Sequence, residues 1–375
     1  MPQESHPDSL VYHFSVIEDP RKRKKDHLLS DILVIAVCAM LCGAEHFTDF
    51  EDFGKAKKDF LRTFLKLPHG IPSHDTFLRV FALLDPKQFA DCFRRWTEGL
   101  RQAIGQEIVA IDGKTLRRSH DRAKGKAPVH MVSAWARENG LVLGQVKVDA
   151  KSHEITAIPE LLQTLKLAGC IVTIDALGCQ TKIAGGIAAA GADYVLALKA
   201  NQETMHAQAK SFLEDAQADG FPEIAHDTLE TRESGHGRKE TRRYWITEDI
   251  DWLTQHEQWP SLRSVGMVES IREVGGQTTV ERRFYLASIR ADAKNFARAV
   301  RGHWAIENTL HWSLDVSFAE DQCRVRSGHA AENLAILRHL SLNLLKQETT
   351  NKRGIKTKQK VAGWDHSYLL KLLAV

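Results

Sequence analysis

Two aspartates occupy matching places in the sequence. Asp112 closes the apolar run 108–111 and precedes Gly113, and Asp175 closes the apolar run 170–174. Short apolar runs of this kind are typical of buried strands, and neighbouring strand ends would bring the two carboxylates together. Two like charges a few ångströms apart must share a proton or bind cations, although either aspartate could instead cap a turn.

Metal binding is the more specific of these interpretations. Hard oxygen ligands select Mg²⁺, for which Mn²⁺ can substitute. Two such ions per site can activate an attacking oxygen and stabilise the leaving oxygen in a phosphodiester displacement. The aspartate pair therefore predicts two-metal chemistry on a phosphate ester, for which no organic cofactor is needed.

A third carboxylate is expected from a helix further along the chain. Glu307 lies one helical turn after His303 and one turn before His311, with Trp304 and Asn308 close by. Asp315 and Asp321 compete with it for this role. The set His303, Glu307 and His311 also admits a transition-metal site, which ranks lower because no fourth ligand accompanies it.

The segments around Asp112 and Asp175 have the order of an α/β core. Strands are predicted at 108–113, 131–137 and 141–148, with a tight turn at Asn139-Gly140. A helix over 159–167 with Pro159 in its first turn, a strand over 170–175, a helix over 182–190 and a strand over 193–199 follow. Three strands, helix, strand, helix, strand is the order of an RNase H-like catalytic core.

The segment before this core has helical periodicity from Ser30, a plausible N-cap, to about residue 100. Apolar residues recur with helical spacing after the turn 70–73, which makes this stretch similar to a helix-turn-helix. In that reading His74, Asp75 and Arg79 would face DNA. An ordinary helix hairpin remains an equal alternative.

The segment after residue 200 is strand-rich, with hairpin turns at 235–237 and 275–276, and reads as an insertion. Helical periodicity returns over 293–314 and 330–345, and the polar stretch 347–360 is expected to be mobile. The predicted organisation is a helical domain at 1–100, a core divided between 101–200 and 288–346, a β-rich insertion at 201–287 and a basic tail at 347–375.

Composition sets wider limits. The 375 residues carry a net charge of +3, so the chain is only mildly basic, but Lys and Arg cluster at 21–25, 232–243 and 346–360 and could follow phosphates. The six cysteines show no Cys-x-x-Cys spacing, which favours a reduced cytoplasmic protein without structural zinc. The longest apolar run, 32–42, is shorter than the roughly 18 residues of a membrane span.

Six short segments together resemble the DDE transposases of bacterial insertion sequences. They are Glu18-Asp19-Pro20-Arg21, Ala110-Ile111-Asp112-Gly113-Lys114, Thr173-Ile174-Asp175-Ala176, Leu198-Lys199-Ala200-Asn201-Gln202, His236-Gly237-Arg238 and His303-Trp304-Ala305-Ile306-Glu307-Asn308. The resemblance covers nearly the whole chain. It is specific to the ISAs-type branch that includes the H-repeat-associated proteins linked to Rhs elements.

The resemblance implies that Asp112, Asp175 and Glu307 are the catalytic, metal-binding triad. The wider group carries a Tyr, Arg, Glu, Lys signature around the glutamate, where this chain has Val300, His303 and Leu314 in place of the Tyr, Arg and Lys. We therefore expect DNA contacts from other residues as well, a set comprising Lys199, Asn201, Arg238, Arg301, His303, Arg324 and Arg326.

The sequence thus predicts a cytoplasmic, nucleoid-associated transposase that cuts DNA at its own terminal inverted repeats and joins the freed 3′ ends to target DNA. A homodimer on paired ends is implied by the resemblance alone. Two rivals share the same features: an RNase H-like nuclease that does not join DNA, and a non-catalytic DNA-binding protein derived from a transposase.

Overall fold

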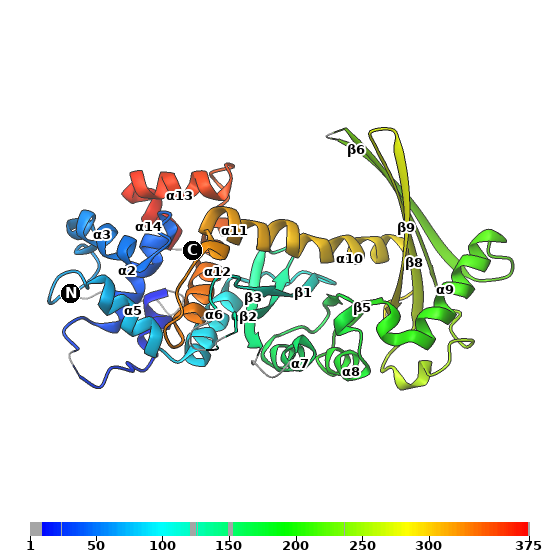
Figure 1. Ribbon diagram of the computed structural model, residues 1–375, viewed down its shortest axis with the longest axis horizontal. Coiled ribbons are helices and arrows are strands. Elements are labelled where there is room, and N and C mark those ends of the chain that lie inside the picture. Colours follow the sequence, from blue (N-terminus) through cyan, green and yellow to red (C-terminus); the bar gives the residue numbers. More distant parts are fainter. Residues whose placement is uncertain are drawn as a thin grey trace.

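We describe the chain from a computed structural model that covers residues 10–23, 25–120, 125, 127–148, 153–235 and 237–373. Lys24 of the first basic run and His236 of the predicted turn at 235–237 lie outside these residues. Helices occupy one end of the molecule and two long β-hairpins project from the other (Figure 1). The sheet that carries the predicted aspartates lies between them.

The N-terminal segment is helical, as predicted: α1 (Leu10–Ser15), α2 (Leu29–Leu41), α3 (Phe47–Ala56), α4 (Lys58–Leu61), α5 (His74–Leu83) and α6 (Pro86–Leu100). The predicted N-cap at Ser30 is wrong, because α2 begins at Leu29 and Leu28 precedes it without a side-chain cap. The apolar burial of α2 fixes its position instead, since every residue of 31–41 is buried.

The helix predicted after the turn at 70–73 is confirmed as α5. Ser73 caps it by accepting a hydrogen bond from the Thr76 amide, and Phe77, Val80 and Phe81 are fully buried. On the opposite side Arg79 is exposed and His74 is bound to Glu51 of α3, with 2.7 Å between His74 Nδ1 and Glu51 Oε2. This face is consistent with either of the two interpretations given above.

Within the described residues, nine strands form one sheet in the order β3-β2-β1-β4-β5-β9-β8-β7-β6. Their bounds are β1 (Ile108–Thr115), β2 (His130–Ala136), β3 (Leu141–Val148), β4 (Ile171–Ile174), β5 (Asp193–Leu198), β6 (His226–Gly235), β7 (Arg238–Thr247), β8 (Ser264–Val274) and β9 (Gln277–Ala287). The pairs β1–β4 and β4–β5 are parallel and the others antiparallel.

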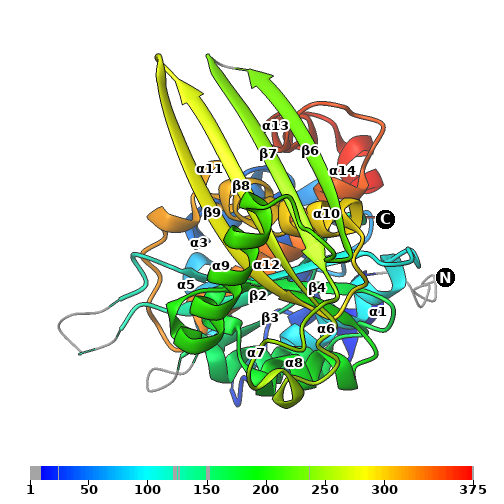
Figure 2. The same cartoon turned by 90° about the vertical axis from the view of Figure 1, so that its right-hand side faces the viewer.

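The strand-rich segment therefore continues the sheet, because β9 pairs with β5. The predicted hairpins are present, and Gly275 and Gly276 turn between β8 and β9 with φ values of 57° and 81°. Beyond the core the strands β6–β9 rise as two hairpin arms, β6–β7 and β8–β9, which are joined side by side by the pairing of β7 with β8 (Figure 2). The segment is not all strand, however, since the helix α9 (Glu203–Ala218) packs on β8 and β9.

Helices cover both faces of the sheet. On one face lie α7 (Glu154–Thr164) and α8 (Thr181–Ala189), whose apolar side chains share a core with Val109 and Ile111. The predicted start at Pro159 is wrong, because α7 begins five residues earlier and holds this proline in its interior. On the other face α10 (Ala293–Ala305) packs on Ile108, Ile171 and Val195.

The helix predicted over 293–314 is divided in the structure. After α10 the chain forms a π-helix at Ile306–His311, called η5, and continues as α11 (Trp312–Phe318). The short 3₁₀ turns are η2 (Ala176–Gly178), η3 (Ala200–Gln202), η4 (His256–Gln258) and η6 (Glu320–Gln322). A π-helical turn places its side chains differently from an α-helical one and is frequent at functional sites.

The last helices return to the N-terminal end of the molecule (Figure 1): α12 (Ala330–Gln347), α13 (Ile355–Trp364) and α14 (His366–Leu373). The expectation of a mobile stretch at 347–360 is wrong for its second half, which is helical in α13. There Lys358 is buried and its Nζ donates to the Leu345 carbonyl at 2.8 Å. None of the helices in the described ranges is long and apolar enough to cross a membrane.

Candidate active site

The parallel pairing of β1 and β4 places Asp112 beside Asp175. Ile111 is the partner of Ile174, so the two aspartates follow at the point where this pairing ends. Asp112 does not close its strand as predicted, because β1 continues to Thr115 on β2. Asp175 does follow the last residue of β4, and its Oδ1 accepts a hydrogen bond from the Leu177 amide at 3.1 Å.

Glu307 joins the two aspartates at one pocket. It lies in the π-helix η5, and the pocket, with a volume of about 260 Å³, is lined by side chains from β1, β4, β5, β9, α10 and η5. Its lining includes Asp112, Thr173, Asp175, Lys199, Arg283, Val300, His303, Trp304 and Glu307. The predicted acidic residues therefore share one cavity although they are far apart in sequence.

The pocket holds an excess of negative charge. Burial, together with the charges of Asp175, Glu154 and Glu307, raises the pKa of Asp112 to about 7. Burial and then the charge of Glu154 also raise the pKa of Asp175, while Lys199 acts in the opposite direction. A group of carboxylates that raise one another's pKa is a feature of functional sites and favours a bound cation.

Glu154 is a residue that the sequence did not single out. It begins α7, and its Oε1 lies 2.6 Å from Nε2 of His130, whose Nδ1 lies 2.8 Å from Oγ1 of Thr115. A Cβ atom on Gly113 would lie 2.2 Å from this carboxylate oxygen, so the glycine after Asp112 leaves room for it. An acidic residue in the first turn of the helix after β3 could have pointed to Glu154. The helix was predicted to begin at Pro159, which left Glu154 outside it.

The competing carboxylates Asp315 and Asp321 are engaged elsewhere. Nζ of Lys114 lies 2.6 Å from Oδ1 of Asp315 and 3.3 Å from Oδ1 of Asp321, and neither aspartate lines the pocket. A carboxylate that is neutralised by a lysine is a poorer ligand for a second cation. This geometry favours Glu307 among the three candidates for the third carboxylate.

The two histidines that flank Glu307 are held neutral. Burial lowers the pKa of His303 to about 4, and its Nδ1 lies 3.3 Å from Oγ1 of Thr173. Burial, with the nearby charge of Lys114, also lowers the pKa of His311 to about 4, and its Nδ1 lies 3.7 Å from Oδ2 of Asp112. A neutral His303 cannot supply the positive charge of the arginine whose position it occupies.

The predicted DNA-contacting residues are spread over several surfaces. Lys199 is exposed at the pocket, and Asn201 donates to the Ala176 carbonyl at 2.7 Å, which links it to the turn after Asp175. Arg238 begins β7 at the tip of the first arm, and Arg301 of α10 is paired with Glu233 of β6 at 2.7 Å. Arg324 and Arg326 are exposed on the segment between η6 and α12.

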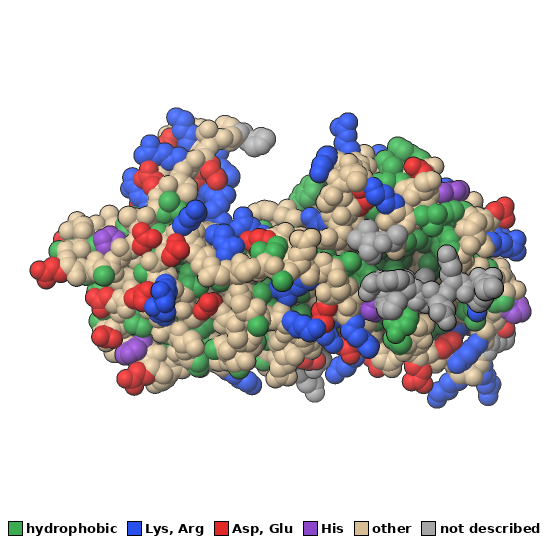
Figure 3. Space-filling view, turned by 180° about the vertical axis from the view of Figure 1, so that it is seen from behind, with side chains coloured by type: hydrophobic (Ala, Val, Ile, Leu, Met, Phe, Trp, Pro, Cys, Tyr) green, Lys and Arg blue, Asp and Glu red, His purple; other side chains and the backbone are tan. Residues whose placement is uncertain are grey.

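Basic side chains gather along the projecting arms, interleaved with acidic ones (Figure 3). Arg242 and Arg243, for example, are paired with Glu240 and Glu230 at 2.6 and 2.8 Å. In the first basic run Arg21 is buried and is paired with Asp19 at 2.8 Å. Part of each of these two basic runs is therefore already neutralised within the protein.

The carboxylates fit hard cations by donor type and charge. However, no three His, Cys, Asp or Glu side chains of the described residues converge closely enough to hold a metal ion. The side chains of Asp112, Asp175 and Glu307 would have to turn toward a common point to bind one. All six cysteines fall within the described ranges and are free thiols.

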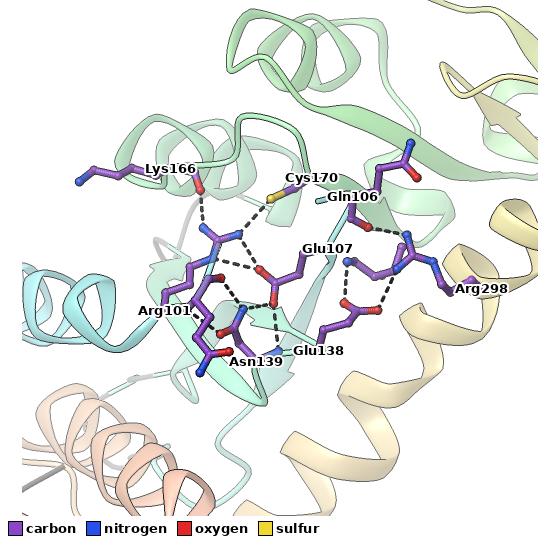
Figure 4. A network of polar contacts seen from close by, with 10 residues as sticks. Arg101, Gln106, Glu107, Glu138, Asn139, Lys166, Cys170 and Arg298 are labelled. Carbon is purple, nitrogen blue, oxygen red and sulfur yellow. Dashed lines mark hydrogen bonds and ion pairs between the residues drawn. The ribbon is translucent and has the colours of Figure 1, made fainter. Parts of the chain in front are cut away.

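A network of polar contacts fixes the start of β1 (Figure 4). The buried carboxylate of Glu107 accepts hydrogen bonds from Arg101 and Asn139, at 2.8 Å from Arg101 Nη2 and 2.7 Å from Asn139 Nδ2. Arg298 of α10 donates to the Gln106 carbonyl and to Glu138. The strand that carries Asp112 is thereby held against α10, the helix that leads to Glu307.

Comparison with known proteins gives consistent matches. Residues 104–344 match the family model described as "Transposase DDE domain", and residues 11–97 match one described as "DDE_Tnp_1-associated". The chain is 39% identical over 371 residues to the H repeat-associated putative transposase YhhI of Escherichia coli (strain K12), with 97% of each chain covered.

It is also 42% identical over 371 residues to the putative transposase YncI of Escherichia coli O157:H7, which covers 98% of this chain and 94% of that one. Among solved structures, the cryo-EM piggyBac transposase synaptic complex with hairpin DNA matches with a TM-score of 0.43 and 10% identity, over 98% of this chain and 79% of that chain.

Proposed function

The chain belongs to the DDE transposase family, and on this basis we propose that it cuts DNA at the ends of its own element and joins the freed 3′ ends to target DNA. The observation that carries this proposal is the shared pocket of Asp112, Asp175 and Glu307. Its substrates would be the terminal inverted repeats and the target DNA. Such a substrate implies a place at the nucleoid.

The catalytic core would be RNase H-like. The supporting features are the strand order β3-β2-β1-β4-β5, the antiparallel pairing of β2 with both β1 and β3, and the parallel pairing of β4 with both β1 and β5. In this arrangement the first aspartate lies on the central strand and the second directly follows the last residue of its parallel neighbour. The helix α10 packs on β1, β4 and β5, and Glu307 follows it in η5.

Asp112, Asp175 and Glu307 would hold two Mg²⁺ ions, with Mn²⁺ as a substitute. When bound, these ions supply Lewis-acid activation of the attacking oxygen and stabilisation of the leaving oxygen. The chain itself brings several carboxylates together in a half-buried pocket. Their negative charges repel one another there, and bound cations would relieve this repulsion. Lys199 and Arg283, which also line the pocket, are suited to contact phosphate oxygens there.

DNA would approach along α10, which runs between the projecting arms and the C-terminal helices (Figure 1). The arms carry Arg238 and Arg272, both half exposed, on this end of the molecule. Two ends of an element must be brought together before joining, so we propose a homodimer as the active form. Because acidic side chains pair with many of the arginines on the arms, this surface is not uniformly basic. DNA would therefore be attracted to particular places on it.

The test is cleavage of supercoiled DNA that carries both flanking element ends, in the presence of Mg²⁺. The natural chain is expected to nick this DNA, and Asp175→Ala is expected to lose metal-dependent cutting while it still binds DNA. The matched control is Asp251→Ala, because Asp251 is an exposed residue of the loop between β7 and η4. It should cut like the natural chain.

The other outcomes identify the rival functions. If the natural chain cuts but never joins the 3′ ends to a second DNA, the protein is a nuclease. If natural and variant chains bind equally and neither cuts with Mg²⁺ or Mn²⁺, the protein is a non-catalytic DNA-binding member of the family.

A further inference from the structure

Lys114, two residues after Asp112, is the centre of a half-buried ion cluster. Its Nζ lies 2.6 Å from Asp315 Oδ1, 3.3 Å from Asp321 Oδ1 and 3.4 Å from Glu320 Oε2, and its side chain is only 12% exposed. Asp315 belongs to α11 and the other two carboxylates to η6. The cluster therefore connects β1 to the segment that follows Glu307.

A second cation lies deeper in the same cluster. Arg338 of α12 is fully buried, and its Nη1 lies 3.6 Å from Oε1 of Glu320, which is also buried. Charges that are removed from water in this way are retained only when their partners are held close. The cluster is therefore built into the interior and is not a solvent-exposed ion pair that forms and breaks freely.

The contacts between β1 and the glutamate helix are matched in spacing. His311 faces Asp112 at 3.7 Å, and Asp315 faces Lys114 at 2.6 Å. Two residues of a strand span about 6.6 Å, and four residues of a helix about 6 Å. The spacing of these two contacts is therefore nearly the same along the strand and along the helix. For this reason the Lys114–Asp315 contact also fixes the position of His311 opposite Asp112.

The other end of this strand is clamped to the same helical segment. Arg298 of α10 binds the Gln106 carbonyl just before β1 and Glu138 just after β2 (Figure 4). The acidic pocket lies between the Arg298 contacts and the Lys114 cluster. Between these two fixed points the helix changes to the π-helical turn that carries Glu307.

We infer that Lys114 is a positioning residue for the proposed DNA cleavage: by holding Asp315, Glu320 and Asp321 it fixes the helix of Glu307 in register with Asp112. This inference rests on the proposed function. Lys114 does not line the pocket, so it acts through the position of the carboxylates and not by contact with DNA. Its loss should therefore reduce the rate of cutting more than the affinity for DNA.

The experiment compares Lys114→Met, Lys114→Arg and the control Lys147→Met. Lys147 is a suitable control because it also joins a strand to a helix, pairing with Glu332 of α12 at 3.5 Å, but at the sheet edge. We expect Lys114→Met to lower the turnover rate at least tenfold, with the DNA KM within about threefold. The Mg²⁺ concentration for half-maximal rate should rise, Lys114→Arg should recover part of the rate, and Lys147→Met should match the natural chain.

Hydrogen exchange of residues 306–318 gives a readout that does not depend on activity. Exchange should accelerate in Lys114→Met but not in Lys147→Met. If Lys114→Met is too unstable to purify, the double variant Lys114→Met/Asp315→Asn removes one charge of each sign and should fold, yet remain slow.

Either of two results would overturn the inference: unchanged exchange over 306–318, or a folded Lys114→Met that cuts within twofold of the natural chain. If the natural chain itself does not cut, the proposed function fails, while the exchange measurement still decides whether Lys114 fixes this helix.

Discussion

At the scale of single residues, the pocket is defined by uncompensated charge. Asp112 accepts a hydrogen bond from the Gly113 amide at 2.9 Å, but its nearest ion-pair partner, at 3.7 Å, is the neutral His311. Lys114, two residues further along, is paired with other carboxylates. Among the described residues Asp112 thus has no cationic side chain paired with it, although a buried aspartate normally needs one. This arrangement suits a residue that binds a cation from solution.

The first prediction concerns the pH dependence of stability without metal. The pKa of Asp112 is raised from 3.8 to about 7, so the folded state favours the protonated form. Its contribution to stability is complete below pH 4 and is lost as pH rises toward and through 7. In EDTA, Asp112→Asn should therefore stabilise the protein by about 1–4 kcal/mol at pH 8 and by less at pH 5.

Glu154→Gln should act in the same direction with a smaller effect, because it removes one of the charges that raise the pKa of Asp112. Thermal unfolding at pH 5 and pH 8 measures both variants against Glu160→Gln, an exposed change on the same helix. Equal gains at the two pH values would contradict the assignment of the raised pKa to Asp112.

At the scale of elements, the close approach of α10 to β1 sets the pocket. A Cβ atom on Gly302 would lie 2.7 Å from Cγ2 of Ile108, so the helix can touch the strand only because this residue has no side chain. The next two residues, His303 and Trp304, line the pocket, and the π-helix follows. The close contact at Gly302 therefore sets how far the helix backbone near Glu307 lies from β1.

Gly302→Ala should push α10 away from β1. We expect a loss of about 1–3 kcal/mol in unfolding free energy from overpacking. DNA cleavage should also fall, since Glu307 lies five residues further along. Denaturant unfolding and the cleavage assay measure these two effects.

The control for this change is Gly99→Ala in α6, where no neighbouring atom lies within 4 Å of the added Cβ. It should be neutral or stabilising by up to about 1 kcal/mol, because alanine is the better helix former. A Gly302→Ala chain as stable and active as Gly99→Ala would show that the packing at Ile108 is not tight.

At the scale of the whole molecule, the predicted domains share one framework. The strands of the β-rich segment extend the core sheet through β5 and β9, and α12 packs on α2, α5, α6 and β3. Asn343 of α12 is fully buried and bonds both backbone groups of Val142, with its amide nitrogen 3.4 Å from Oγ1 of Thr97. One side chain thus joins α12 to the sheet edge and to α6.

We therefore expect the N-terminal helices and the core to unfold in one transition. Far-ultraviolet circular dichroism and tryptophan fluorescence should give coincident curves. Asn343→Leu, which leaves the Val142 amide and carbonyl without this partner, should lower the unfolding free energy by about 1–3 kcal/mol and keep a single transition. Two separated transitions in the natural chain would instead support domains that fold independently at the predicted boundary near residue 100.

The local features of this protein can be predicted from its sequence alone. Short-range preferences, which depend on neighbours in the chain, account for the strands around Asp112 and Asp175 and for the order of elements between 108 and 198. They also account for the helix after the turn at 70–73 and for the glycine hairpins. The family resemblance is confirmed by the matches over residues 104–344 and to YhhI. The starts of elements were predicted less well: in α2 burial outweighs local capping, and α7 holds Pro159 in its interior and not in its first turn.

Which charges face one another depends on how the elements pack together in the fold. No local pattern shows that the charge of Glu154 acts on the aspartates, or that Lys114 pairs with Asp315 and Asp321 and so keeps them away from the pocket. The π-helical turn at Glu307 and the continuation of the sheet into the arms are likewise invisible to periodicity. The physical reason is that ion pairing and packing depend on distances between elements far apart in the chain, whereas sequence patterns record only what each element needs for itself.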